Sequence, residues 1–228
     1  MTTVTAQSEP LVRWDWIGRH LDAIRTQFLQ HVELTVIAVG IGLAISIPLA
    51  VFAYRNRRAY APITWVAGLL YTMPSLALFA LISPFLGFTV LTAEIGLVSY
   101  TLLILIRNIV AGLTGVPGDV KEAAVGMGYT PRQLLLRVEL PLALPVIVAG
   151  IRIATVTTIG LVTVTALIGK GGLGHFILEG KDQSFPTEIL LGAVLSVLFA
   201  VAADWTLIGA ERVLTPWSRS ARVRAFGR

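Results

Sequence analysis

The chain has 228 residues, of which 55% are hydrophobic and only 14% are charged, and its mean hydropathy is +0.79. A soluble domain carries about 25% charged residues, so this composition excludes a soluble globular protein and predicts an integral membrane protein. The formal net charge is +5, which in this class indicates basic loops facing an anionic cytoplasmic leaflet rather than a surface for nucleic acid.

Residues 1–30 precede the first long apolar run and show no signal-peptide pattern. Apolar side chains recur there every three or four positions, which predicts one face of an amphipathic helix. They are Leu11, Trp14, Ile17, Leu21, Ile24 and Phe28. We therefore expect residues 1–30 to lie on the membrane surface, followed by a transmembrane domain at 31–215 and a basic tail at 216–228.

Five segments are apolar enough to cross a bilayer, which takes about 20 residues of helix. They are 32–54, 61–82, 90–113, 144–168 and 187–210. Small residues within them are expected to let neighbouring helices approach closely. The candidates are Gly40, Gly42, Gly150 and Gly160. The sequence thus predicts an all-α polytopic membrane protein with five transmembrane helices.

The basic residues define the expected orientation, because cytoplasmic loops are enriched in Lys and Arg. They gather between spans one and two, between spans three and four, and after span five. The residues are Arg55, Arg57, Arg58, Lys121, Arg132, Arg137, Arg212, Arg219, Arg222, Arg224 and Arg228. These three segments alternate correctly to share one side. We place them in the cytoplasm and the N-terminus outside.

The third connection interrupts the apolar sequence with a long polar stretch, EAAVGMGYTPRQLLLRVELPLALP. Asp119 followed three residues later by Glu122 resembles a capping box. The pattern predicts a short helix over 120–127, ended by Gly128 through a positive φ.

A second helix start follows in the same stretch. Thr130, Pro131 and Gln133 supply a cap, a proline at the first helical position and a capping-box partner. Pro141 and Pro145 are expected to bend or break the start of the fourth span. A plain connecting loop is the alternative, but a loop needs only about 4–6 residues. An ordered elbow indicates a docking surface.

The spacing of this stretch resembles the EAA motif of ABC-importer permeases, E-A-A-x3-G-x9-I-x-L-P, with Val138 in place of Ile. The matching residues are Glu122, Ala123, Ala124, Gly128, Leu140 and Pro141. The resemblance implies a coupling helix at about 119–137 that sits in a cleft of a cytoplasmic ATPase. Glu122 would make the polar contact, the two alanines would allow close packing, Gly128 would form the turn, and Leu140-Pro141 would lead into the fourth span.

Four further segments resemble the osmoprotectant branch of these permeases, which carries glycine betaine, carnitine, choline or proline betaine. They are 72–87, 106–113, 139–155 and 166–180. The resemblance implies a type I ABC importer fold like that of methionine permeases, in the bacterial plasma membrane. The implied partners are ATPase subunits, an extracytoplasmic solute-binding protein and a second permease subunit, identical or paralogous. The alternatives are a permease for methionine or an alkyl sulfonate, an ATP-independent channel or secondary transporter, and a membrane scaffold.

Polar residues within the spans are candidates for the translocation pathway, because they are costly in lipid. Arg107, Arg152 and Asp204 lie toward the cytoplasmic side, and Asp204 either pairs with one of the arginines or contributes to a gate. Asn108 is a candidate for a hydrogen bond between helices.

A second pathway candidate is the mid-span sequence YTMPS, where Pro74 predicts a kink next to Tyr71 and Ser75. A quaternary ammonium group is best held by aromatic faces. The spans offer few of these, chiefly Trp65, Tyr71, Phe79 and Tyr100. This scarcity favours a weak, transient passage and leaves high-affinity capture to a separate binding protein.

Other patterns do not support an enzyme. Gly169, Gly171 and Gly174 match a dinucleotide fingerprint but follow a membrane helix rather than a strand. We expect an external glycine-rich loop there, with a contact to the binding protein as one role. The chain has no phosphate-binding loop sequence, no cysteine and no histidines at metal-ligand spacing. We therefore expect no cofactor and no catalytic residues, with ATP hydrolysis in a partner subunit.

Overall fold

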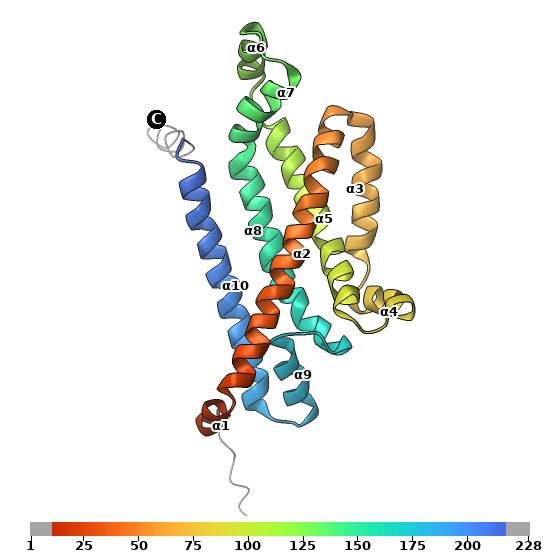
Figure 1. Ribbon diagram of the computed structural model, residues 1–228, viewed down its shortest axis with the longest axis vertical. Coiled ribbons are helices and arrows are strands. Elements are labelled where there is room, and N and C mark those ends of the chain that lie inside the picture. The colour runs from red at the N-terminus through yellow and green to blue at the C-terminus, as the bar shows by residue number, and fades with distance from the viewer. Residues whose placement is uncertain (1–10, 218–228) are drawn as a thin grey trace, which may run out of the picture.

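The computed structural model describes residues 11–217, which form an elongated, all-helical bundle (Figure 1). The elements in chain order are α1 (Trp14–Arg19), α2 (Leu21–Arg55), α3 (Arg57–Thr72), α4 (Ser75–Leu86), α5 (Val90–Thr114), α6 (Gly118–Gly126), α7 (Pro131–Leu134), the π-helical segment η1 (Leu135–Glu139), α8 (Leu140–Val164), the 3-10 segment η2 (Thr165–Ile168), α9 (Gly174–Asp182) and α10 (Pro186–Leu214).

Among residues 11–217, four helical stretches are long and apolar enough to cross a membrane: α2, α5, the continuous stretch Pro131–Ile168, and α10. The predicted second span is different. It is divided into α3 and α4, which meet at 96° and together count as one further candidate span. Pro74 was expected to kink this span, but the chain breaks there, because Met73 takes the extended conformation that a following proline favours (φ −64°, ψ 133°). Figure 1 shows α4 lying across the direction of α3.

The expected interfacial segment is organised differently from the sequence-based division at residue 30. Only α1 is separate, and α2 begins at Leu21 and continues as the first span. The second half of the amphipathic pattern is therefore continuous with the span. The backbone N–H of Arg13 donates to Thr187 Oγ1 at 3.0 Å, which fixes α1 against the start of α10. The basic tail beyond Trp217 lies outside the described residues.

Helix α5 forms the centre of the bundle and packs against α2, α3 and α8. A Cβ on Gly42 would collide with Thr101 of α5, and a Cβ on Gly150 would collide with Asn108, so both glycines permit close helix approach as expected. Gly40 and Gly160 have open space where a side chain would be, so no helix of the described residues approaches closely at these two positions.

The glycine-rich loop after η2 is fixed by a buried histidine that the sequence did not single out. His31 is fully buried, its Nε2 lies 3.0 Å from the carbonyl oxygen of Ile159, and the N–H of Leu173 donates to its Nδ1 at 3.3 Å. Gly172 has φ +47°, and a Cβ there would lie 2.7 Å from the Cβ of His31. The loop therefore packs against α2 and α8, so glycine is required at this position for conformation and for space.

Candidate functional site

The polar stretch folds as an elbow at one end of the bundle, where α6 and α7 extend beyond the spans (Figure 1). Helix α6 begins at Gly118 with Pro117 in the cap position and no side-chain cap. The predicted capping box between Asp119 and Glu122 is therefore wrong, because the helix starts two residues too early for Asp119 to cap it. Asp119 instead lies in the first turn, where a negative charge is favourable next to the helix N-terminus.

Gly128 ends α6 as predicted. It has φ +84°, its N–H donates to Val125 O at 2.9 Å, and the N–H of Tyr129 donates to Ala124 O at 3.2 Å. These two hydrogen bonds define a Schellman turn, which needs a residue in the left-handed region. Gly128 has open space around it, so its conformation rather than crowding requires glycine.

The second helix start is also confirmed. Thr130 and Gln133 form a reciprocal capping box, with the Thr130 N–H donating to Gln133 Oε1 at 2.9 Å. The helix then continues through η1 into α8. Contrary to one part of the expectation, Pro141 and Pro145 therefore do not break the helix. The π-helical turn just before Pro141 absorbs the disturbance, because the Leu140 N–H donates to Leu135 O, five residues back.

The elbow presents a mixed surface to solvent. Glu122 and Ala123 are exposed, and so are the apolar side chains of Val125 and Met127, at 58% and 70%. Ala124 is only 2% exposed and packs inside the chain. The two alanines of the motif are therefore not equivalent: Ala123 is available to a partner and Ala124 supports the elbow itself. Exposed apolar side chains beside an acidic one are typical of a protein-binding surface.

A network of polar contacts at the base of the elbow was missed by the sequence analysis. Lys121 Nζ donates to Tyr54 OH at 2.9 Å and to Leu113 O at 3.2 Å, and it lies 3.6 Å from Glu139 Oε1. Tyr54 OH in turn donates to Glu139 Oε1 at 2.6 Å. Glu139 is 5% exposed. The network joins α6 to the ends of α2 and α5 and to η1.

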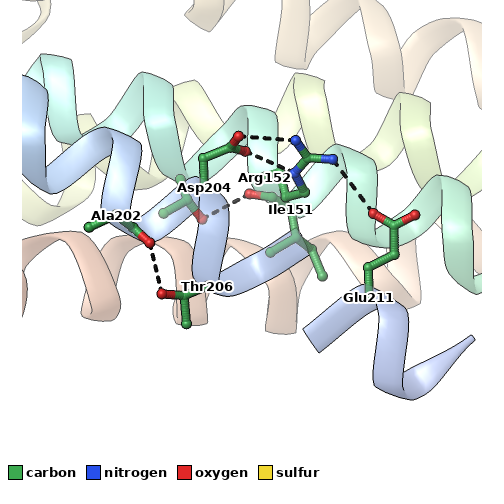
Figure 2. A network of polar contacts seen from close by, with 7 residues as sticks. Ile151, Arg152, Ala202, Asp204, Thr206 and Glu211 are labelled. Carbon is green, nitrogen blue, oxygen red and sulfur yellow. Dashed lines mark hydrogen bonds and ion pairs between the residues drawn. The ribbon is translucent and has the colours of Figure 1, made fainter. Parts of the chain in front are cut away.

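A second polar cluster joins α8 to α10 (Figure 2). The Arg152 guanidinium binds both carboxylate oxygens of Asp204, at 2.8 and 3.1 Å, and reaches Glu211 Oε2 at 3.5 Å. This confirms the expectation that Asp204 pairs with an intramembrane arginine. The pair satisfies two charges that would otherwise be costly within a span.

The six predicted pathway residues do not form one site. Tyr71, Pro74 and Ser75 lie at the corner between α3 and α4, where the Tyr100 hydroxyl donates to Met73 O. Tyr71 and Tyr100 also make an edge-on ring contact, with centroids 6.0 Å apart.

The other three pathway candidates lie elsewhere. Arg107 faces a cavity at the end of α5 next to the elbow, and Arg152 contacts α10. Asn108 packs against Gly150. Its Nδ2 donates to Ile104 O of its own helix at 2.8 Å, so the predicted hydrogen bond between helices is wrong.

Long membrane-crossing helices with a helix–glycine–helix elbow at one end are the features that the resemblance to ABC-importer permeases implies. Residues 38–210 match the family of binding-protein-dependent transport system inner membrane components, and the chain belongs to this family. It is therefore an inner-membrane permease, and ATP hydrolysis takes place in a separate subunit. Membership excludes the scaffold and the ATP-independent transporter as alternatives.

The chain is also similar in sequence to individual permeases and in structure to a solved transporter. The chain is 38% identical to the choline transport system permease protein of Bacillus subtilis over 187 residues, which are 82% of this chain and 86% of that one. It is 40% identical to an osmoprotectant import permease protein of Salmonella typhimurium over 192 residues, covering 82% and 89%. An inward-facing MetNI methionine ABC transporter has the same fold, with a TM-score of 0.75 at 22% identity over 84% of this chain and 96% of that one.

Proposed function

We propose that the chain forms the translocation pathway of an importer for osmoprotectants with a quaternary ammonium group, such as glycine betaine, carnitine or choline. The observation that supports this most strongly is its identity of 38–40% to choline and osmoprotectant permeases over most of both chains. The similarity to the methionine transporter is 22% identical and supports the fold alone. Methionine and alkyl sulfonates are the competing substrates.

The elbow is the proposed coupling site for the ATPase. Glu122 and Ala123, both exposed, contact the ATPase together with the apolar Val125. Ala124 and Gly128 hold the elbow in shape. Leu140 and Pro141 carry the displacement into the fourth span. When two ATPase subunits close on ATP, the elbows move, and the pathway turns from inward-facing to outward-facing.

The proposed assembly places this elbow in the cytoplasm and the opposite end, with α1 and α9, outside the cell. Residues 11–217 supply four candidate spans and the bent α3–α4 pair. We infer that a second permease subunit, identical or paralogous, completes the pathway. A solute-binding protein delivers the substrate at the outer end.

The α3–α4 corner is the proposed gate. Tyr71 is 39% exposed, whereas Tyr100 and Phe79 are buried. Tyr71 therefore presents an aromatic ring beside the break at Pro74 and Ser75, and an aromatic face attracts a quaternary ammonium. At the corner itself, this one ring fits a brief contact during passage rather than storage of the substrate, and the exposed Trp65 lies further along α3.

The test is uptake into proteoliposomes that contain the full chain with its ATPase and binding protein. We would compare glycine betaine, carnitine, choline, proline and methionine, each with and without ATP on the ATPase side. The proposal predicts ATP-dependent uptake of one or more quaternary ammonium compounds and none of methionine. ATP-dependent uptake of methionine alone would overturn the substrate assignment and leave the permease assignment intact.

A further inference from the structure

A basic cavity opens where the cytoplasmic ends of α2, α3 and α5 meet the elbow. Its volume is about 770 Å³, and three of its lining side chains are cationic: Arg57, Arg107 and Lys121. Tyr54 and Tyr60 add two hydroxyl groups. No acidic side chain of residues 11–217 lines it. The cavity therefore carries a concentrated positive charge and several hydrogen-bond donors.

Two of the three cations lack a protein counter-charge. Lys121 is paired with Glu139, but Arg57 and Arg107 make no hydrogen bond or ion pair with a described residue. Arg107 belongs to the membrane-crossing helix α5 and is exposed to the cavity, so its guanidinium is available to a ligand there. An anion in the cavity would compensate for both charges, and phosphate oxygens suit the donor geometry of arginine.

An apolar groove continues from this cavity along the same three helices. It has a volume of about 340 Å³ and is lined by Leu49, Pro62, Ile63, Val66, Ala67, Leu70, Leu102 and Ile106. Ile106 lines the groove and its neighbour Arg107 lines the cavity, so the two adjoin. On α3, likewise, Tyr60 lines the cavity and Ile63, one turn deeper in the membrane, lines the groove.

This order of polarity is that of a lipid in the cytoplasmic leaflet, with a charged head at the membrane surface and an acyl chain beneath it. We propose that the basic cavity binds the phosphate headgroup of an anionic phospholipid and that the apolar groove holds one of its acyl chains. A free phosphate would use the cavity alone and leave the groove without a role. Basic pockets between membrane helices are known to hold anionic headgroups. The choice of leaflet rests on the orientation proposed above.

The site has a direct connection to the elbow. Lys121 lines the cavity from α6 and also donates to Tyr54 OH and to Leu113 O. A bound headgroup would therefore contact the same lysine that joins the elbow to α2 and α5. This placement makes the lipid a structural ligand of the coupling site rather than part of the general bilayer.

The experiment measures lipid retained by the full chain, purified in its transporter complex in detergent and examined by native mass spectrometry. The probes are dioleoyl phosphatidylglycerol, the neutral dioleoyl phosphatidylcholine, and glycerophosphoglycerol, which is the headgroup without chains. We expect selective retention of phosphatidylglycerol. Its affinity should fall about fivefold in Arg57→Gln or Arg107→Gln and about thirtyfold in the double variant, as expected for about one charge contact per arginine.

Two matched variants complete the design. Arg58→Gln removes the same charge from the same helix but does not line the cavity, so it should keep wild-type retention. Val66→Trp fills the exposed groove, so it should lose phosphatidylglycerol but still bind glycerophosphoglycerol. Because no transport is measured, this result is independent of the substrate assignment.

Three outcomes would overturn the proposal. Equal retention of phosphatidylcholine and phosphatidylglycerol would exclude a headgroup site. Unchanged retention in the double arginine variant would place the lipid elsewhere, even if that variant lowers substrate uptake. Binding of glycerophosphoglycerol as tight as that of the whole lipid, with no effect of Val66→Trp, would indicate a site for small anions.

Discussion

At the scale of single residues, the elbow depends on one backbone conformation. Gly128 has φ +84° and closes the Schellman turn that separates α6 from α7. The direction of α6, and with it the position of Glu122, follows from that turn. The neighbouring Gly126 lies inside α6 without a positive φ and with open space around it.

Substitution of Gly128 therefore tests the turn. Gly128→Val should destabilise the elbow by about 1–2 kcal/mol, because a side chain is strained in the left-handed region. Gly128→Asn should be tolerated better, because Asn enters this region more readily. We would measure thermal stability and co-purification of the ATPase, with Gly126→Ala as the control that should behave like wild type. Equal effects of Val and Asn would argue against a conformational cause.

At the scale of elements, the elbow is attached to the bundle through buried polar contacts rather than through apolar packing alone. Tyr54 from α2, Lys121 from α6 and Glu139 from η1 contact one another, and Lys121 also reaches the end of α5. These contacts connect α6 to three helical segments of the bundle. We therefore expect a displacement of α6 to act directly on α2, α5 and η1 through these contacts.

Removal of one side chain of this network should lower the stability of the protein if the network attaches the elbow to the bundle. Glu139→Ala should lower stability by about 1–3 kcal/mol, because it leaves Tyr54 OH without its acceptor and Lys121 without its counter-charge. The double variant Lys121→Met/Glu139→Gln should lose less stability than the sum of the losses in Lys121→Met and Glu139→Gln. The reason is that the two side chains interact with each other. Thermal unfolding of the purified complex measures both, with the exposed Arg137→Ala as control. Simple additivity would mean that the three side chains do not act together.

The sequence predicts the elements better than it predicts their contacts. Four spans, the Gly128 turn and the Thr130 capping box follow from apolar length and local hydrogen bonding, and all of them are found. The corner at Pro74 was expected only as a kink, because local sequence indicates a freed hydrogen bond but not the tertiary packing that fixes an angle of 96°.

The contacts that the sequence did not predict were missed for one common reason. Lys121 was counted only as a topology charge, and Glu139 occupies a variable position of the motif. Their contact joins residues far apart in sequence, and so does that of His31 with Ile159. Periodicity and spacing carry no information about such pairs. The one signal in the sequence was the position of Glu139 itself, a carboxylate directly before Leu140 at the edge of an apolar run.

At the scale of the whole molecule, the chain is a permease subunit of an ABC importer whose ATPase is a separate subunit. The elbow lies at the opposite end of the bundle from α1 and α9 (Figure 1), and we propose that it receives the motion of the ATPase. The central claim is that Glu122 on this elbow couples ATP hydrolysis to transport.

The most direct measurement compares substrate uptake and ATP hydrolysis in the same proteoliposomes for the wild type and for Glu122→Arg. Glu122 is exposed, so the variant should fold and insert normally. Reversal of the charge at the ATPase contact should cost several kcal/mol and lower uptake by more than about tenfold. Any hydrolysis that remains should no longer depend on substrate and binding protein. Uptake at the wild-type rate by the variant would contradict the account.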